Sequence, residues 1–534
     1  MRGALTPSSP GGRLAALLVL LAALLALVAG CSDDDGAELP PPGQPGALAA
    51  FLPAGSAVYF DVTTDEESEQ WTQAEALAGH FPGFPGLLRD LEDDLTAEGV
   101  TFDQLRAVAG DRIAFALPTF NLQSDEDPPV LILAEIAEGQ EEAALDLLMS
   151  GESELVSAGE HEGVEYFTDD ESALAITDGA LVAAIGPESE RDLFAALDAH
   201  DDADTTLAAQ PAFTDALAEL PEETAATGFV DIAGIFRSVL EDVPELQDLD
   251  VVSLDEDTAL GVAAVAEAEG LHITGSMVNG PEAAGGGFAP TLLDRAPADA
   301  IAYLGISDAA GAVSQGITGA EGEAAEGLRD QVEFFSRQLQ AALGISTDDL
   351  AFLFGGEQAI VVTPGVEFPG VAILLKVDDP ARATSVLERL RAGVPEILGV
   401  TGAPGAGRQF RQVPLDNGVQ GWELPILPGL SIVYGVDDDV VILGTSTDAV
   451  RQVQTPQGSL SGSPAFQAGT ARVPDEVGGL FLVDIQRVIG ALEAAGILGD
   501  LPRELLENLE PLGGVTAWSG TDQRTFEAFL SIGE

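Results

Sequence analysis

The sequence predicts an α+β fold made of two homologous tandem domains, each a mainly antiparallel sheet with helices packed on one face. Three observations lead to this prediction. The chain has 534 residues, which is enough for two substantial hydrophobic cores. Short β-type runs alternate with helical patterns along the chain. A series of segments also recurs in the same order in both parts of the chain.

The N-terminus has the features of an export signal followed by a lipid-attachment site. Arg2 and Arg13 precede an apolar run over 14–30, and "VAGC" resembles a bacterial lipobox. Residues 1–30 are therefore predicted to be a lipoprotein signal peptide, cleaved before a lipid-modified Cys31. The alternative is an uncleaved anchor helix, because the run approaches the roughly 18–20 residues that span a bilayer. In both cases the body of the protein is exported and membrane-attached.

Cys31 is also the only cysteine of the chain. Its modification leaves no thiol for an internal disulfide or a thiolate metal site, so the exported body depends on core packing for stability. The acidic and proline-rich residues 31–47 look like a tether. The expected location is extracytoplasmic, as a membrane-anchored lipoprotein of the bacterial cell envelope, in contact with the membrane through its lipid.

The internal repeat is visible as two pairs of matching stretches. "PAGSAVYFDV" (53–62) matches "PADAIAYLGI" (297–306). "PAFTDALAELPEETAATGFVDI" (211–232) matches "PAFQAGTARVPDEVGGLFLVDI" (464–485) without a gap. The order of the matches is unbroken, which predicts one fold built twice.

The repeat also sets the predicted domain boundaries. The α+β repeat 1 covers 48–280 and the α+β repeat 2 covers 291–534. Between them, residues 281–290 are rich in Gly, Ala and Pro, which is typical of a linker.

The elements of repeat 1 can be assigned in order. The runs "AVYFDV", "RIAFALP", "VLILAEI", "ALVAAIG" and "ATGFVD" are short strands, some alternating and some continuously apolar. In "GLLRDLEDDLTAE", Leu87, Leu88, Leu91 and Leu95 share one face of a helix. Turns such as "TDG" (177–179) favour antiparallel neighbours.

The formal net charge of −69 restricts the partners of the protein. A field of this sign repels phosphates, so nucleic-acid binding is excluded. Residues 48–280 carry 52 acidic against 5 basic residues, and residues 291–534 carry 33 against 14. The acidity fits solubility or salt adaptation. The imbalance between the halves favours slightly the other interpretation, loose binding of calcium or of a cationic partner.

The chain contains no motif for catalysis or cofactor binding. A phosphate-binding loop with its lysine, H-E-x-x-H and G-x-S-x-G are all absent from the sequence. No catalytic, cofactor-binding or metal-binding residue is assigned, no cofactor is expected, and the protein is predicted not to be an enzyme. The acidic loops at 255–261 and 437–439 leave a weak possibility of calcium, although they miss the EF-hand spacing.

Two further features favour structural roles. "HFPGFPGLL" (80–88) is unusually apolar for a loop and is interpreted as a core-capping turn before a helix, or alternatively as a groove or partner-docking loop. Asp231 and Asp484 end the matched stretches, and each precedes apolar residues with helical spacing. Both aspartates are predicted to be helix N-caps and not a catalytic pair.

Three segments together indicate a family. "LPAGSAVYFDV", "FPGFPGLLRDLEDDL" and "GVTFDQLRAVAGDRIAFAL" resemble the exported bacterial family of unknown function DUF3352, in two tandem copies. The resemblance covers most of repeat 1 and, more weakly, repeat 2, which lacks the F-P-G-F-P-G-L-L segment. It implies a secreted or lipid-anchored envelope protein and brings no activity and no catalytic residues.

Three functions remain open from the sequence. The leading one is a non-enzymatic, lipid-anchored cell-envelope protein with a structural or binding role and a cationic or envelope partner. The second is an extracytoplasmic ligand-binding protein that uses the cleft between the repeats. The third is a hydrolase that uses carboxylates, which requires acidic side chains that converge in a cleft with raised pKa values.

Overall fold

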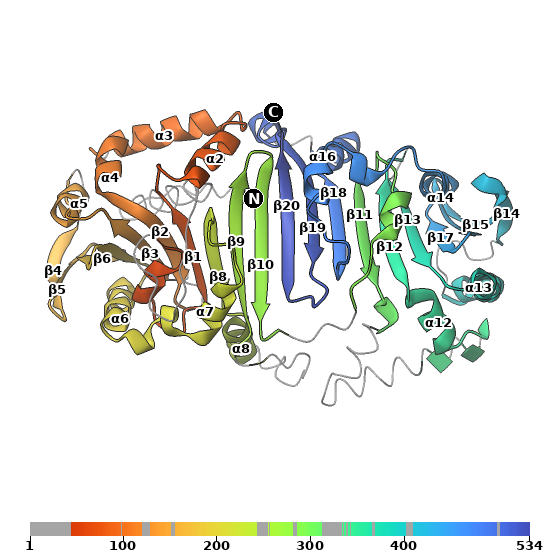
Figure 1. Cartoon of the computed structure of the whole chain (residues 1–534), viewed down its shortest axis with the longest axis horizontal. Helices are drawn as coiled ribbons and strands as arrows, with labels where there is room; N and C mark the ends of the chain where they lie inside the picture. The colour runs from red at the N-terminus through yellow and green to blue at the C-terminus, as the bar shows by residue number, and fades with distance from the viewer. Residues whose placement is uncertain are drawn as a thin grey trace.

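The computed structural model describes residues 44–97, 99–119, 129–150, 155–242, 255, 257–280, 286–311, 334, 336–337, 340–341, 343–365, 369–401, 409–498 and 502–533. Cys31 and the predicted signal peptide lie outside these residues. The described chain forms one long, curved antiparallel sheet with helices around it (Figure 1).

Ten strands of this sheet come from the first half of the chain. They are β1 (Val58–Thr63), β2 (Ala109–Leu117), β3 (Val130–Ile136), β4 (Val156–His161), β5 (Val164–Thr168), β6 (Ser172–Thr177), β7 (Ala180–Ile185), β8 (Ala226–Val230), β9 (Ala259–Glu267) and β10 (Gly270–Val278). Their order across the sheet is β4-β5-β6-β7-β3-β2-β1-β8-β9-β10, and every neighbouring pair is antiparallel.

The second half of the chain provides the other ten strands. They are β11 (Ala302–Ser307), β12 (Glu357–Thr363), β13 (Gly370–Lys376), β14 (Arg411–Pro414), β15 (Gln420–Leu427), β16 (Leu430–Asp437), β17 (Val440–Gly444), β18 (Gly479–Asp484), β19 (Leu512–Ser519) and β20 (Thr525–Ile532). Their order is β14-β15-β16-β17-β13-β12-β11-β18-β19-β20. Both halves of the sheet therefore have the same strand order.

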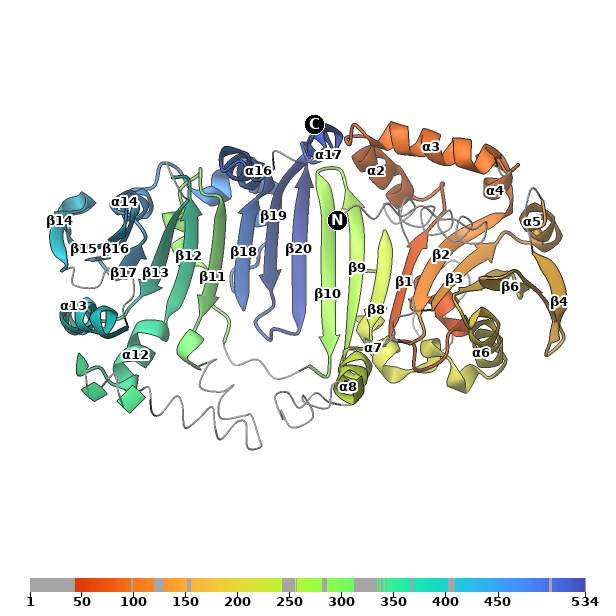
Figure 2. The ribbon, with the colours of Figure 1, turned by 180° about the vertical axis from the view of Figure 1, so that it is seen from behind.

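The two halves are joined by the pairing of β10 with β20, at the centre of the sheet (Figure 2). Gly270 begins β10 with a φ of 155°, and a Cβ atom there would lie 2.0 Å from the carbonyl oxygen of Leu530. Only glycine allows the two backbones to approach this closely. We therefore find one continuous sheet, where the sequence predicted a separate sheet for each half.

Helices connect the strands in both halves. They are α2 (Glu69–Ala78), α3 (Phe84–Ala97), α4 (Phe102–Val108), α5 (Glu141–Leu148), α6 (Ser189–Asp201), α7 (Pro211–Ala218), α8 (Ile232–Asp242), α12 (Thr347–Phe354), α13 (Pro380–Thr401), α14 (Thr447–Gln454), α15 (Gln467–Thr470), α16 (Ile485–Ala494) and α17 (Arg503–Glu507). Short 3-10 helices are η1 (Ala47–Phe51), η2 (Ala203–Thr205), η3 (Leu207–Ala209), η4 (Thr291–Arg295), η5 (Asp416–Gly418) and η6 (Leu460–Gly462).

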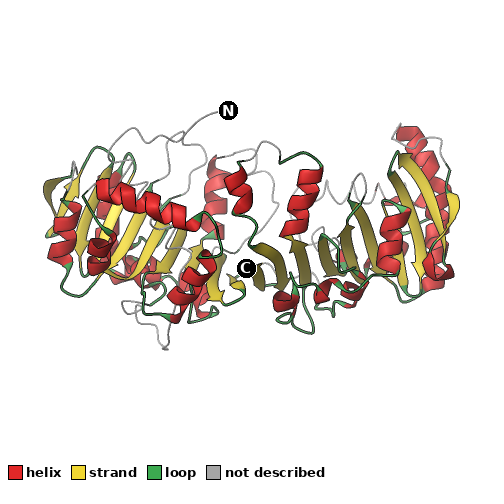
Figure 3. Cartoon of the chain, turned by 90° about the horizontal axis from the view of Figure 1, so that it is seen from above, coloured by secondary structure: helices red, strands yellow, loops and turns green. Residues whose placement is uncertain are grey.

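These helices cover both faces of the sheet (Figure 3), so the prediction of helices on one face was wrong. On β7, Val182 packs in a cluster with Leu193 of α6, whereas its neighbour Leu181 packs on the opposite face with Leu148 of α5. In the second half, α14 lies on one face and α12 and α13 lie on the other. The physical reason is that β6, β7 and β8 are almost continuously apolar, and such strands need cover on both sides.

Candidate functional site

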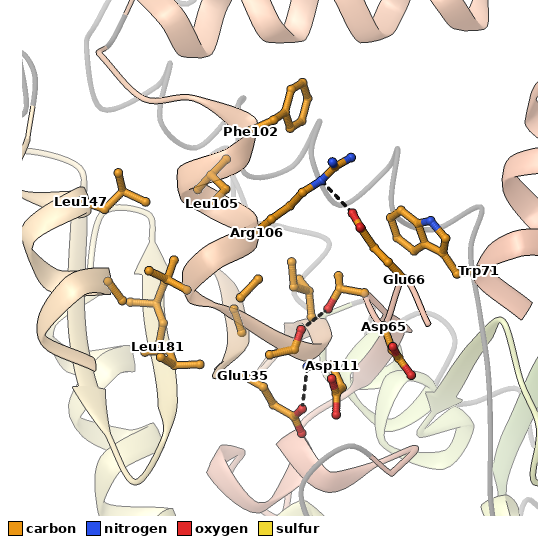
Figure 4. A pocket seen from close by; sticks show the side chains of 18 of the residues that line it. Asp65, Glu66, Trp71, Phe102, Leu105, Arg106, Asp111, Glu135, Leu147 and Leu181 are labelled. Carbon is orange, nitrogen blue, oxygen red and sulfur yellow. Dashed lines mark hydrogen bonds and ion pairs between the residues drawn. The ribbon is translucent and has the colours of Figure 1, made fainter. Parts of the chain in front are cut away.

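A pocket of about 590 Å³ lies in the first half, between the sheet and helices α2 to α5 (Figure 4). Its floor is formed by Ile113 of β2, Ala134 of β3 and Leu181 of β7. These three residues are direct cross-strand neighbours, because Ile113 pairs with Ala134 and Ala134 pairs with Leu181. The floor is therefore a single apolar row of the sheet.

The walls of the pocket are also apolar. Helix α4 contributes Phe102 and Leu105, and α5 contributes Leu147. Helix α3 lies outside α4 and is held to it by Leu91 and Leu95, which are 1% and 3% exposed. A cavity of this size with a mainly apolar lining is of the kind that binds small molecules.

Charged side chains surround the apolar interior. The lining includes six carboxylates and two guanidinium groups, which are Asp65, Glu66, Glu75, Glu92, Asp111, Glu135, Arg89 and Arg106. We call this set the rim. Its formal charge is negative, in keeping with the excess of acidic residues in the first half.

One ion pair crosses the rim from α4 to the loop after β1. Nε of Arg106 lies 2.7 Å from Oε1 of Glu66, and the two side chains are 59% and 43% exposed. The indole of Trp71 lies beside Glu66 (Figure 4). Exposed pairs of this kind contribute about 0–1 kcal/mol, so a ligand could separate the two side chains at little cost.

A second group of rim carboxylates lies at the edge of the sheet. Asp111 is an exposed residue near the start of β2, and its backbone N–H donates to Oε2 of Glu135 at 3.2 Å. Partial burial raises the pKa of Asp111, and the negative charge of Asp65 raises this pKa further. Two carboxylates that oppose each other's ionisation favour a positive group between or beside them.

A fully buried ion pair lies directly behind these rim residues. Asp61 of β1 accepts hydrogen bonds from the guanidinium of Arg112, from the Tyr59 hydroxyl at 2.6 Å and from the Gly46 N–H at 2.7 Å. Asp61 and Arg112 are 0% and 1% exposed. They join β1, which Asp65 follows, to β2, which carries Asp111. Asp61 also holds the chain just before η1 through its bond to Gly46. No sequence pattern distinguishes this pair from the other charged residues of the chain.

The predicted caps lie away from the pocket. Oδ1 of Asp231 accepts from the backbone N–H of Gly234 at 2.7 Å, just before α8. Oδ1 of Asp484 accepts from the backbone N–H of Arg487 at 2.9 Å, at the start of α16. Each aspartate therefore bonds the third residue of its helix, and neither lines the pocket.

The apolar segment 80–88 contributes to the pocket through α3. Phe84 and Leu88 line the pocket, whereas Leu87 is 42% exposed. Before the helix, the Gly83 N–H donates to Oδ1 of Asn508 at 2.6 Å. The segment thus forms a wall of the cavity and a contact with the second half of the chain.

The expected cleft between the repeats can be compared with the described part of the chain. A second, smaller pocket of about 210 Å³ is lined by Pro297, Asp416 and Arg451. The larger pocket lies within the first half and the smaller one within the second half. Neither lies at the β10–β20 junction, where the cleft between the repeats was expected. The described residues contain no group of three or more His, Cys, Asp or Glu that could hold a metal ion. Within these same residues, no helix is long and apolar enough to span a bilayer.

The rim residues and the small floor residue Ala134 were missed by sequence reasoning. The rim acids cannot be distinguished among ninety acidic residues. A sequence signal for Ala134 does exist, since it interrupts the large aliphatic residues of "VLILAEI" on the covered face. That signal becomes useful only when the strand pairing is known.

Comparison with solved structures gives a distant likeness. Two crystal forms of TP0453, III and I, match with 12% and 13% identity and TM-scores of 0.24 and 0.25. The matches cover 43% of this chain and 79% and 77% of the TP0453 chains. At these TM-scores the likeness carries no argument. A search of curated proteins gives no match.

The family comparison covers almost the whole chain. The family described as "Protein of unknown function (DUF3352)" matches residues 13–532, which include both halves of the sheet and the pocket. The chain therefore belongs to the DUF3352 family of proteins of unknown function.

Proposed function

We propose that this protein is an exported, lipid-anchored binding protein of the bacterial cell envelope, which takes up a small apolar ligand in the pocket of its first half. The observation that carries the proposal is the pocket of about 590 Å³ above Ile113, Ala134 and Leu181. Ligand sites have volumes of roughly 300–1,000 Å³, with apolar linings and few polar groups. The proposed role is binding without catalysis.

The location of the ligand differs from the cleft expected from the sequence. The β10–β20 pairing fills the junction with a hydrogen-bonded strand pair, so the proposal places the ligand beneath α2 to α5 of the first half. We also propose that the halves are homologous tandem repeats. Their identical strand order supports this origin, together with the ungapped match between residues 211–232 and 464–485.

The anchor part of the proposal rests on the "VAGC" sequence and its apolar run. A diacylglyceryl group on Cys31 has two chains, which is enough for stable attachment. Replacement of Cys31 by serine is expected to move the protein from the membrane fraction to the soluble exported fraction. A membrane pool of unchanged size in the Cys31→Ser strain would contradict lipid anchoring.

The binding part can be tested with N-phenyl-1-naphthylamine, a neutral dye whose fluorescence rises in apolar sites. We expect saturable binding to the wild type and at least about tenfold weaker binding to Ala134→Leu. The leucine adds three carbon atoms to the floor, and each methylene of ligand that loses burial costs about 0.8 kcal/mol. Ala107→Leu is the matched control, because Ala107 is exposed on α4 and does not line the pocket. Equal affinities for the wild type and Ala134→Leu would reject the pocket as the binding site.

A further inference from the structure

We propose that the ligand of this pocket is an amphiphilic organic cation, with its apolar body on the floor and its ammonium group among the rim carboxylates. This inference rests on the proposed binding function and adds the charge of the ligand. The observation behind it is the composition of the rim, where six carboxylates face two guanidinium groups. A buried apolar body gives affinity, and complementary charge selects among apolar ligands.

The two arginines of the rim are already engaged. Arg106 is paired with Glu66 at 2.7 Å. Arg89 lies on the exposed side of α3, and its Nε donates to the backbone carbonyl of Pro85 at 3.1 Å. The charge of Arg106 is therefore compensated by a carboxylate, whereas Arg89 bonds a neutral carbonyl and keeps its charge. Six carboxylates against two guanidinium groups still leave the rim negative, so it attracts cations more than anions.

The opposite edge of the rim places negative charge at the end of the apolar floor. Asp65 follows β1, Asp111 lies near the start of the neighbouring strand β2, and Glu135 follows Ala134 on β3 (Figure 4). The floor residue Ala134 is thus next in sequence to a rim carboxylate. Both residues line the pocket, so this carboxylate lies at the margin of the apolar floor.

An aromatic face completes the arrangement. Trp71 of α2 lines the pocket beside Glu66 and is only partly exposed. Indole rings attract organic cations through their π electrons, and trimethylammonium groups are bound in proteins by aromatic rings and carboxylates together. Trp71, Asp65 and Asp111 supply both kinds of contact.

Three rim positions differ in charge at the corresponding places of the second half. In the strand pairings, the place of Glu135 is taken by Lys376, the only lysine of the chain. The place of Asp111 is taken by Gly356 and that of Arg106 by Ala351. The acidic rim is therefore a property of the pocket and does not follow from the strand order, which both halves share.

Three ligands with the same ten-carbon chain separate charge from apolar affinity. Decyltrimethylammonium, decanol and decyl sulfate would each displace N-phenyl-1-naphthylamine from the full exported chain, below their micellar concentrations. We expect the cation to displace the dye at about tenfold lower concentration than decanol in low salt, and decyl sulfate to be the weakest competitor. The difference should shrink as salt is raised, because the rim is partly exposed.

Two double variants identify the carboxylates that are responsible for the preference for the cation. Asp65→Asn/Asp111→Asn is expected to lose most of the preference for the cation while decanol displaces the dye as before. The control is Asp201→Asn/Asp202→Asn, which removes the same charge from exposed positions outside the pocket. Equal loss in both double variants would assign the preference to the overall charge and overturn the inference.

The remaining outcomes are also decisive. Equal displacement by decyltrimethylammonium and decanol would overturn the charge preference but leave the apolar pocket supported. If decyl sulfate displaces the dye at lower concentration than decyltrimethylammonium, the preference for a cation is overturned in favour of an anion bound at Arg106. If the dye fails to bind the wild type, the proposed function itself is rejected.

Discussion

The same face of the sheet is built differently in the two halves of the molecule. In the first half, β2, β3 and β7 present Ile113, Ala134 and Leu181 to the pocket. The equivalent places in the second half hold Gln358, Leu375 and Val441. These residues occupy the same positions in the strand pairings of the two halves.

Among the described residues, these substitutions explain why this face of the sheet has a pocket in the first half and is packed in the second half. Leu375 is 2% exposed and belongs to a buried cluster with Leu353 of α12 and Val386 of α13. The Nε2 of Gln358 donates to the last carbonyl of α12, Phe354, at 2.6 Å and holds this helix to the sheet. Ala134 and Ile113 provide neither the volume nor the hydrogen bond. A shared strand order therefore does not determine where a cavity forms.

The buried charges of the two halves also differ. Asp61 and Arg112 of the first half are replaced by Gly305 and Glu357 at the equivalent places. Glu357 accepts from the Leu292 N–H at 2.6 Å and lies 3.8 Å from Lys376. In both halves a buried carboxylate thus holds the chain beside the first 3-10 helix, η1 or η4. The carboxylate comes from β1 in one half and from β12 in the other.

The largest expected loss of stability comes from removing a buried carboxylate, and it should differ between the two halves. Asp61→Ala leaves Arg112 buried without its counterion, which costs about 3–5 kcal/mol of unfolding free energy. Glu357→Ala should cost less, about 1–3 kcal/mol, because Lys376 is 38% exposed and can be hydrated. Urea unfolding of both variants measures these costs. Equal losses would contradict the view that the Asp61–Arg112 pair is the more deeply buried one.

The next largest loss of stability is expected at Leu375, which occupies the place of Ala134 in the second half. Leu375→Ala should cost about 2–5 kcal/mol, since it creates a cavity in a close-packed cluster. The reciprocal change Ala134→Leu should lie within about 1 kcal/mol of the wild type, because the leucine enters the pocket without displacing other side chains. Thermal and urea unfolding compare the two variants. A loss for Ala134→Leu as large as that for Leu375→Ala would show that the floor is already closely packed.

A smaller effect, similar in both halves, is expected at the helix caps. Asp231→Ala and Asp484→Ala should each cost about 0.5–2 kcal/mol, the usual effect of losing an N-cap. Asp484 also lies 3.0 Å from the guanidinium of Arg487, so its loss should be the larger of the two. Melting temperatures identical to that of the wild type would refute the capping role.

The smallest effect is a difference in acid sensitivity between two capping boxes. Asp349 caps α12 together with Ser346, and hydrogen bonding to Arg389 lowers the pKa of Asp349 to about 2. The first-half box at α4 uses Thr101 and the uncharged Gln104. A lowered folded-state pKa stabilises the protein above the unfolded pKa of about 4, and this contribution is lost as pH falls towards 2.

Unfolding measured at pH 6 and pH 2.5 reports this difference. The stability gap between the wild type and Asp349→Asn should shrink at the lower pH, whereas the gap for Gln104→Ala should stay constant. A pH-independent gap for Asp349→Asn would contradict ionisation as the source of its effect.

Local features of the fold could be predicted from the sequence because they depend on neighbouring residues. Asp178 and Gly179 form the tight turn between β6 and β7, and Asp231 and Asp484 bond the first turns of their helices. The α+β class and the antiparallel pairing follow from the same local patterns. The β10–β20 pairing depends on contacts between residues far apart in the chain, so no local pattern indicates it.

The pocket could not be predicted for a related reason. Its floor joins Ile113, Ala134 and Leu181 from three strands, and its existence depends on one small side chain in that row. The continuous apolar runs of β6 and β7 did contain the information that both faces are covered. Such runs are the local signal in the sequence that contradicts helices on a single face.

The measurement that tests the central claim most directly is photolabelling with an apolar diazirine, followed by peptide mass spectrometry. The difference between the halves predicts labels within 102–113 and 134–148, around the pocket. The equivalent segments 347–358 and 375–387, whose inward side chains are packed, should be labelled far less. Equal labelling of both sets of segments, or labelling of the second set alone, would contradict a binding pocket that belongs to the first half.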